Sequence, residues 1–238
     1  MRALLLAAGF GTRLRPLTNN TPKCMIEVNG RPLLSYWFDI LNCDVINKIL
    51  INLHYLPEQV IEFIEKSELK SKIDTVHENI LLGTAGTILQ NKFFFKDDAI
   101  MLIHADNLTF FDIDEFINRY VNRGKGIEIL MMTFETDDPP SCGIVKLDEN
   151  GIVIGFYEKT NSVHGNIANA AVYIISQSVV TFIKDLNKDF VDFSTEVLPN
   201  FIGKIQTYHN KIYHRDIGTL KSLLKAENDI KDIQLIKQ

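Results

Sequence analysis

The segment ALLLAAGFGTR, residues 3–13, decides the fold, and TPK follows it closely at residues 21–23. Its apolar start predicts a β-strand, and its glycines predict a tight turn at the end of that strand. A turn with Gly9 and Gly11 exposes backbone N–H groups that approach a phosphate without interference from a Cβ atom. Arg13 and the lysine of TPK add two cations there. These groups are suited to hold a polyphosphate while one of its phosphorus atoms is attacked.

Two common nucleotide-binding motifs do not fit this turn. A dinucleotide fingerprint needs a third glycine where this chain has Leu14, and that glycine packs the helix on the strand. A Walker A loop needs four residues between its glycines and then Gly-Lys-Ser/Thr, which is absent here. The simplest alternative is a tight strand-to-helix turn with a solvated Arg13.

Composition excludes several classes of protein. The chain has 238 residues, of which 46% are hydrophobic and 23% charged, so it can bury an ample core as one large domain. The net charge is −5 and there is no basic run, which argues against nucleic acid as the main partner. Three widely spaced cysteines suit reduced thiols in the cytoplasm. We find no membrane-spanning stretch and no cleavable signal, so we expect a cytoplasmic protein with no membrane partner.

Strand-like and helix-like patterns alternate through the first half of the chain. We expect strands at Leu4–Ala8, Lys48–Leu53, Ile73–His77, Ala99–His104 and Ile127–Phe134, and helices at Leu33–Leu41, Pro57–Lys66, Ala85–Lys92 and Ile113–Asn122. This order predicts an α/β fold with a doubly wound, mostly parallel, Rossmann-like sheet. Ligands of such sheets bind beyond the carboxyl ends of the strands.

The pattern changes after about Pro139. We expect strands at Gly143–Leu147, Ile152–Glu158 and Asn169–Ile175, a helix at Asp192–Phe201, two short strands between Lys204 and His214, and a final amphipathic helix from Thr219. We interpret this half as a small β lobe folded onto the same sheet. The final helix could pack internally or form the face of a homodimer.

Two aspartates follow predicted strands. Asp106 comes after an apolar run, and Asp216 ends a second strand and precedes Gly218. Two carboxylates at strand ends can share one Mg²⁺ with triphosphate oxygens. The alternative is that both are helix-capping residues. Because His104 and His214 each lie two residues before an aspartate, a His/Asp transition-metal site is a further, weaker alternative.

The first segment, together with TPK, resembles the amino-terminal signature of the sugar-1-phosphate nucleotidylyltransferases. The resemblance implies that the backbone around Leu6, Ala7, Ala8 and Gly9 faces the base of a nucleoside triphosphate. It also implies that Gly11, Thr12 and Arg13 hold the phosphates and that Lys23 lies at the α-phosphate. HADN and DIGT resemble two further family segments, which implies that Asp106 and Asp216 hold Mg²⁺.

Further segments extend this resemblance over nearly the whole chain. LLGTAGTI, residues 81–88, is similar to the family's loop under the base and ribose, which implies contacts from Gly83 and Thr84. Glu78 stands where relatives carry a base-reading Gln or Glu. A carboxylate accepts hydrogen bonds and donates none, and guanine offers two adjacent donors, so Glu78 favours GTP. On the sugar side the resemblance implies Asn107, Gly143, Glu158, Lys159 and Asn169.

Two residues depart from the family pattern. Ala105 stands where the family usually has glycine, and we expect its methyl group to crowd the site. Thr160 replaces the proline of an E-K-P segment.

The resemblance implies one catalytic domain over residues 1–238, with a nucleotide-binding half (about 1–135) and a sugar-phosphate-binding half (about 136–238). Its reaction would be Mg²⁺-dependent transfer of a nucleotidyl group to a sugar 1-phosphate, releasing pyrophosphate, for glycan precursors. Arg13 and Lys23 would be the catalytic cations. The alternatives are a cytidylyl- or uridylyltransferase, including one for phosphocholine, and a non-catalytic nucleotide-binding regulatory subunit. A dehydrogenase is a distant third, because the glycine fingerprint is incomplete.

Overall fold

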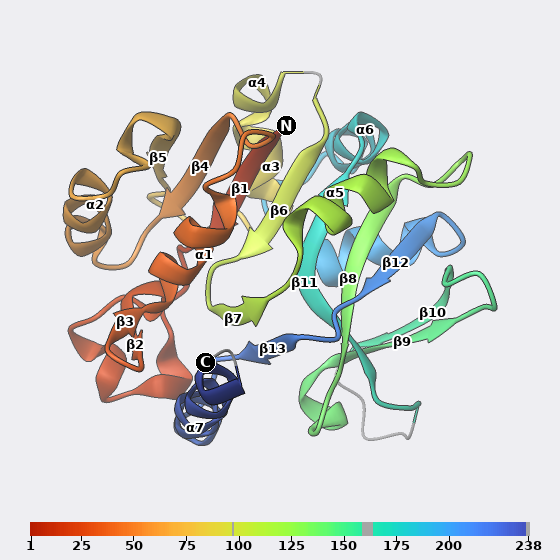
Figure 1. The fold of residues 1–238 in the computed structure, drawn as a ribbon. Coiled ribbons are helices and arrows are strands. Elements are labelled where there is room, and N and C mark those ends of the chain that lie inside the picture. The colour runs from red at the N-terminus through yellow and green to blue at the C-terminus, as the bar shows by residue number, and fades with distance from the viewer. Residues whose placement is uncertain (97, 159–163, 237–238) are drawn as a thin grey trace.

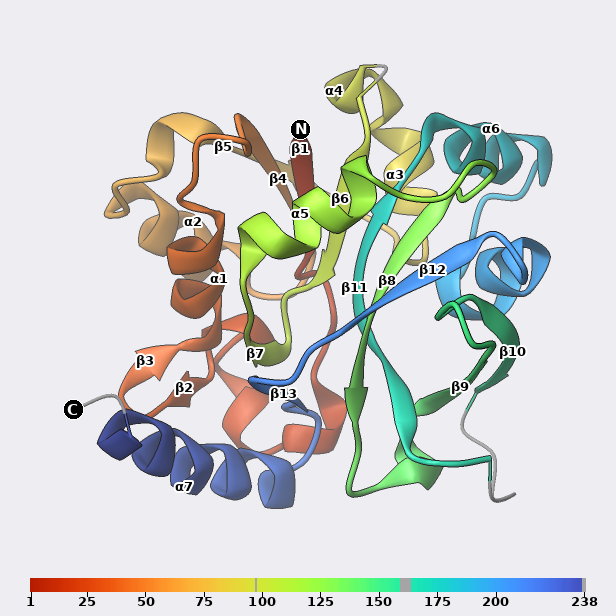
Figure 2. The same cartoon turned by 45° about the vertical axis from the view of Figure 1, so that its right-hand side comes forward.

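A computed structural model describes residues 1–96, 98–158 and 164–236 of the chain, with side chains up to residue 231. Its centre is a twisted sheet with helices on both faces (Figures 1 and 2). Within the described residues, the sheet has nine strands in the order β10-β9-β11-β6-β1-β4-β5, with β8 paired to β11 and β12 paired to β8. The expected α/β class with a doubly wound, Rossmann-like sheet is confirmed.

The strands of this sheet are β1 (Arg2–Leu6), β4 (Lys48–Leu53), β5 (Ile73–His77), β6 (Ile100–His104), β8 (Ile129–Glu135), β9 (Gly143–Leu147), β10 (Val153–Glu158), β11 (Ile167–Ile175) and β12 (Ile205–His209). Two short two-stranded sheets lie outside it: β2 (Glu27–Val28) with β3 (Arg31–Pro32), and β7 (Asn107–Phe110) with β13 (Tyr213–Asp216). The helices are α1 (Leu33–Leu41), α2 (Pro57–Glu65), α3 (Gly86–Gln90), α4 (Lys92–Phe95), α5 (Ile113–Val121), α6 (Gln177–Asp185) and α7 (Leu220–Ile236).

The helices divide between the two faces of the sheet, as Figures 1 and 2 show. Trp37 of α1, Val60 of α2 and Phe116 of α5 belong to one hydrophobic core cluster. Ile88 of α3 and Val179 of α6 belong to a second cluster on the other face. The strands β5, β4, β1 and β6 are parallel. β4, β1 and β6 are buried between these layers, which explains their nearly continuous apolar sequences, whereas the edge strand β5 is largely exposed.

The small sheet of β7 and β13 brings together residues far apart in the sequence. The two strands are antiparallel, and Asn107 is paired with Asp216. Asp106 therefore lies beside the pair that ends in Asp216. The amphipathic helix α7 follows, and its Leu223, Ala226 and Ile230 pack in a third hydrophobic cluster.

Two parts of the second half differ from expectation. Residues 192–201 do not form a regular α-helix: Phe193–Val197 is a π-helix and Leu198–Phe201 a 3₁₀ turn. Pro199 lacks the N–H that a regular helix needs there. The helix α6 was not expected, because its valines, threonine and isoleucine have modest helix propensity. Within the described residues, no helix is both long and apolar enough to cross a membrane.

Candidate active site

The first cavity of the site lies over the carboxyl ends of the parallel strands. The register of the sheet places Leu6 of β1 between His104 of β6 and Asn52 of β4. All three residues line a cavity of about 260 Å³, which we call the nucleotide cavity. The remaining lining residues are Ala8, Gly9, Glu78, Leu81, Gly83, Thr84, Thr87, Asp106, Phe190 and Asp192. Ligand binding at this edge is what a doubly wound sheet predicts.

Glu78 is fixed at the back of the nucleotide cavity by a buried polar network. Its side chain is buried, and its Oε1 accepts hydrogen bonds from Asn52 Nδ2 at 2.9 Å and from Thr87 Oγ1 at 2.6 Å. The second oxygen, Oε2, accepts only a longer bond from Leu82 N at 3.3 Å. Asn52 Oδ1 in turn accepts from Ala7 N at 2.8 Å. Glu78 is therefore positioned as a hydrogen-bond acceptor, and its Oε2 can accept a further hydrogen bond from a ligand.

The loop after Glu78 packs tightly against a second loop that sequence reasoning missed. Gly83 has a φ of +79°, and a Cβ atom there would lie 2.4 Å from the carbonyl oxygen of Val191. Thr84 Oγ1 accepts a hydrogen bond from Phe193 N at 2.7 Å. This contact carries Phe190 and Asp192 into the lining of the nucleotide cavity. Nothing in the sequence alone joins two loops that are about 100 residues apart.

The glycines of the first turn have different roles. Gly9 lines the nucleotide cavity, and the space where its Cβ would stand is open. Gly11 has a φ of +62°, and a Cβ there would lie 2.9 Å from the methyl carbon of Thr18, so local packing requires a glycine. Gly11 and Thr12 lie outside the lining of the nucleotide cavity, and Arg13 lines two neighbouring cavities instead.

A cluster of charges forms the junction of the site. Lys23 Nζ lies 2.5 Å from Asp106 Oδ2 and 3.3 Å from Asp216 Oδ1, while the Arg13 guanidinium lies 3.9 Å from Asp216 Oδ2. A Cβ at Gly218 would lie 2.7 Å from Asp216 Oδ2 and 2.9 Å from the Arg13 guanidinium, so this glycine leaves room for both groups.

In this cluster, burial and the neighbouring charges shift the pKa values of the side chains in opposite directions. Burial alone would lower the pKa of Lys23, but Asp106 and Asp216 outweigh it and the pKa is raised. Burial alone would raise the pKa of Asp106, but Lys23 outweighs it and the pKa is lowered. Lys23 and Asp106 are therefore both charged near neutral pH.

The two aspartates have the chemistry and the proximity that a magnesium site needs. Both carboxylates lie within 3.3 Å of one nitrogen, Lys23 Nζ. Mg²⁺ prefers oxygen ligands and is commonly held by one or two carboxylates plus substrate phosphates. Within the described part of the chain, no group of three His, Cys, Asp or Glu residues is arranged to hold a metal.

A second cavity, of about 180 Å³, lies on the other side of this junction. We call it the sugar cavity. It is lined by four of the expected residues, namely Asn107, Gly143, Glu158 and Asn169, and by Arg13, Asp106, Asp216, His104 and His214, with Phe134, Ser141, Cys142, Ala170, Ala171 and Ser194 completing it. The expected residue Lys159 lies outside the described residues, as does Thr160.

Local geometry explains two of these positions. Gly143 is paired with Glu158 across β9 and β10, and a Cβ there would lie 2.6 Å from Glu158 Oε2. The missing side chain thus makes room for the glutamate. Asn169 begins an irregularity in β11, where Ala171 has a φ of +52°. Such bulges re-aim side chains beside functional sites.

The expectation that Ala105 crowds the site is wrong. Side chains alternate along the end of β6, so His104 and Asp106 line both cavities. Ala105 is fully buried and belongs to the core cluster on the opposite face. Its methyl group therefore takes no space from a ligand.

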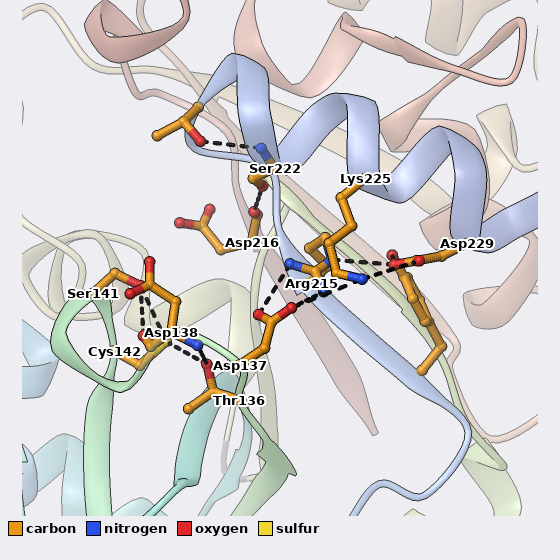
Figure 3. A network of polar contacts seen from close by, with 12 residues as sticks. Thr136, Asp137, Asp138, Ser141, Cys142, Arg215, Asp216, Ser222, Lys225 and Asp229 are labelled. Atoms are coloured by element: carbon orange, nitrogen blue, oxygen red, sulfur yellow. Dashed lines mark hydrogen bonds and ion pairs between the residues drawn. The ribbon is translucent and has the colours of Figure 1, made fainter.

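The loop that leads into β9 is tied to the strand that carries Asp216. Arg215 donates from both terminal guanidinium nitrogens to Asp137, at 3.4 and 3.1 Å. Asp229 of α7 lies 3.4 Å from Arg215 Nε. Lys225 Nζ forms ion pairs with both Asp137 and Asp229, as Figure 3 shows. The hydrogen bond from Arg215 lowers the pKa of Asp137. This network holds the loop with Ser141 and Cys142 beside the sugar cavity.

The chain belongs to the nucleotidyl transferase family, whose sequence profile matches residues 2–233. It is 28% identical over 232 residues to the mannose-1-phosphate guanylyltransferase catalytic subunit beta of Dictyostelium discoideum, which covers 95% of this chain and 63% of that protein. It is 29% identical over 233 residues to a mannose-1-phosphate guanylyltransferase of Mycobacterium tuberculosis, covering 96% of this chain and 64% of the relative. The chain thus spans less than two thirds of the length of these relatives.

Solved structures share the fold of this chain. HddC from Yersinia pseudotuberculosis complexed with GMP-PN superposes with a TM-score of 0.79 at 27% identity, covering 96% of this chain and 99% of that one. A putative glucose-1-phosphate thymidylyltransferase from Bacillus anthracis gives a TM-score of 0.86 at 21% identity, covering 96% and 94% of the two chains. The second likeness concerns the fold alone.

Proposed function

We propose that the protein transfers a nucleotidyl group from a nucleoside triphosphate, preferably GTP, to a sugar 1-phosphate, releasing pyrophosphate. The observation that carries this proposal is the meeting of two cavities at one charged junction. His104 and Asp106 line both cavities, and Lys23 bridges Asp106 to Asp216 beside them. A nucleotide on one side and a sugar phosphate on the other would meet there. The similarity to guanylyltransferases supports the same reaction.

In this reaction the protein would position the two substrates and neutralise charge on their phosphates. The phosphate of a sugar 1-phosphate is already an anion, so it can attack the α-phosphorus without a general base. Arg13 and Lys23 would neutralise charge on the α-phosphate and the departing pyrophosphate. Holding both substrates in adjoining cavities makes a bimolecular reaction effectively unimolecular.

We propose Asp106 and Asp216 as the residues that hold Mg²⁺. When bound, the ion would supply further charge neutralisation at the phosphates. Lys23 already contacts both carboxylates, so its ammonium must share them with the metal or move toward the phosphate.

The preference for GTP rests on Glu78. Its network leaves Oε2 available as an acceptor, and guanine offers two adjacent donors to such an oxygen. HddC, a structural relative complexed with GMP-PN, is consistent with this preference. Because the relatives are mannose-1-phosphate guanylyltransferases, mannose 1-phosphate is the first sugar substrate to test. The product would then be a nucleotide sugar that serves as a glycan precursor.

The acceptor is more consistent with a sugar than with phosphocholine. Glu158, Asn169 and Asn107 place hydrogen-bonding groups along the sugar cavity, whereas a quaternary ammonium is usually bound by aromatic rings. A non-catalytic subunit has little support, because Lys23, Asp106 and Asp216 are present and in mutual contact.

We further propose that residues 1–238 act as one domain in the cytoplasm. A single sheet runs through both halves of the chain, and Cys24, Cys43 and Cys142 are free thiols, which suits a reducing compartment. A homodimer stays a prediction, which light scattering would test.

The test is pyrophosphate release with Mg²⁺ across a grid of five nucleoside triphosphates and a panel of sugar 1-phosphates plus phosphocholine. Release that requires one nucleotide and one sugar phosphate together would support the transferase. Nucleotide binding without release in any well would favour the non-catalytic alternative. Asp216→Asn should shift the Mg²⁺ titration to higher concentration, and an unchanged titration would contradict its role as a ligand.

A further inference from the structure

His104 lies in the candidate active site, but the proposed reaction gives its side chain no role so far. It is the last residue of β6 and is paired with Leu6 of β1. Its side chain lines both the nucleotide cavity and the sugar cavity, a property it shares with Asp106 among their described lining residues. A ligand that extends from one cavity into the other must pass this imidazole.

The imidazole of His104 is incompletely bonded. Its Nε2 is buried and makes no hydrogen bond within the described residues. A buried polar atom without a partner carries a free-energy cost that a bound acceptor or donor removes. This unsatisfied group points to a missing polar ligand.

The charges around His104 indicate which polar ligand fits. Five carboxylates line the two cavities, namely Glu78, Asp106, Glu158, Asp192 and Asp216, and Lys23 is already engaged by two of them. A phosphate entering this junction therefore needs hydrogen-bond donors besides the two cations. An imidazole carries at least one ring N–H and can donate it to a phosphate oxygen.

We propose that His104 donates a hydrogen bond from its ring to the phosphates that join the two halves of the bound ligand. In the proposed reaction, these are the phosphate of the sugar 1-phosphate and the α-phosphate, which become the diphosphate bridge of the nucleotide sugar. His104 is thus a substrate-contacting residue that positions the attacking and accepting groups. This inference rests on the proposed function, because it takes a nucleotide sugar as the ligand.

The experiment measures product binding, so that it does not depend on turnover. GDP-mannose, UDP-glucose and dTDP-glucose are titrated into wild-type protein by calorimetry, and the tightest of them is then titrated into three variants. His104→Leu keeps a similar volume without the donor, and His104→Gln keeps an amide donor. His209→Leu is the control, because His209 is an exposed histidine outside both cavities. Melting temperatures verify that each variant folds.

His104→Leu should weaken binding by roughly 10- to 100-fold, the scale of one lost hydrogen bond to a charged group. His104→Gln should recover most of this loss, and His209→Leu should bind as the wild type does. Equal affinity in His104→Leu and wild type would overturn the inference. So would equal losses in both His104 variants, because the lost property would then be packing.

Failure of the proposed function gives a different pattern. A wild type that binds none of the three nucleotide sugars and releases no pyrophosphate contradicts the transferase itself, and the role of His104 falls with it. A wild type that binds one of them, with His104→Leu unaffected, leaves the transferase standing and removes only His104 from its site.

Discussion

Replacing Lys23 by methionine is the most informative single change. The lysine side chain is only 9% exposed, whereas those of Asp106 and Asp216 are 33% and 48% exposed. Removing one partner of a buried ion pair typically costs about 3–5 kcal/mol, and the partial exposure of the aspartates places this case near about 3 kcal/mol. For a chain of this length, that corresponds to a fall of roughly 6–12 °C in melting temperature.

The same change removes a cation from the junction of the two cavities. We expect kcat to fall roughly 10²–10³-fold, the scale for losing one preorganised electrostatic group. Because the two carboxylates then lack a protein cation between them, Mg²⁺ should raise the melting temperature of Lys23→Met more than that of the wild type.

The assay combines pyrophosphate release with thermal unfolding across an Mg²⁺ titration. Lys48→Met is a matched control, because Lys48 forms an exposed ion pair with Asp74 at 3.5 Å, and its loss should leave both measurements nearly unchanged. Near-normal turnover in folded Lys23→Met would refute the role of this lysine in catalysis. An identical Mg²⁺ response in variant and wild type would refute its competition with the metal.

Three further changes test other parts of the site. Glu78→Gln replaces one acceptor by a donor and should reduce the preference for GTP over UTP by roughly 10-fold or more in kcat/KM; an unchanged ratio would exclude Glu78 from base reading. Gly143→Ala would place a Cβ 2.6 Å from Glu158 Oε2 and should raise the KM for the sugar phosphate, with the Kd for nucleotide unchanged; a rise in both would contradict the assignment of separate cavities. Burial lowers the folded-state pKa of His214 to about 3 from 6.5, so the unfolded state binds more protons below pH 6.5 and stability is lost as the pH falls. Between pH 8 and pH 5 the wild type should lose about 2 kcal/mol more than His214→Gln in denaturant titrations, and parallel pH profiles would contradict this burial.

The sequence predicted the parallel half of the sheet well, because β1, β4 and β6 are short apolar runs and clear helical patterns separate them from one another and from β5. The Gly-rich turn and the aspartates that follow β6 and end β13 were recognisable from local sequence. Residues near the ends of parallel strands meet at one edge, so this rule pairs the Gly9–Arg13 turn with Asp106, whereas Leu6 and Glu78 were assigned to the base by the family resemblance.

Contacts between distant loops could not be predicted in this way. The loop with Phe190 and Asp192 reaches the nucleotide cavity only because Gly83 packs against Val191. The pairing of Asn107 with Asp216 depends on two short strands with little sequence signal. Asn52 did carry a signal, since it is a polar residue at the end of an apolar strand, and such residues are hydrogen-bonded when buried.

The role of Ala105 shows how strand alternation corrects an argument from resemblance. A side chain one position before a functional aspartate points to the opposite face of the sheet, so its size affects the core and leaves the cavity unchanged. His104, two positions before the same aspartate, faces the site instead. The sequence suggested a metal ligand at His104 only as a weaker alternative, whereas its place in the lining of both cavities supports contact with the substrate.

The central claim is that two substrates react at the junction of the two cavities. Phosphorus NMR of wild-type protein with Mg²⁺, GTP and mannose 1-phosphate tests it most directly, with the other pairs of the grid tried in turn. The resonance of pyrophosphate and the paired diphosphate resonances of a nucleotide sugar should grow by equal molar amounts. This growth should occur only when both substrates are present. Inorganic phosphate with a nucleoside diphosphate, or no change with any pair, would contradict it.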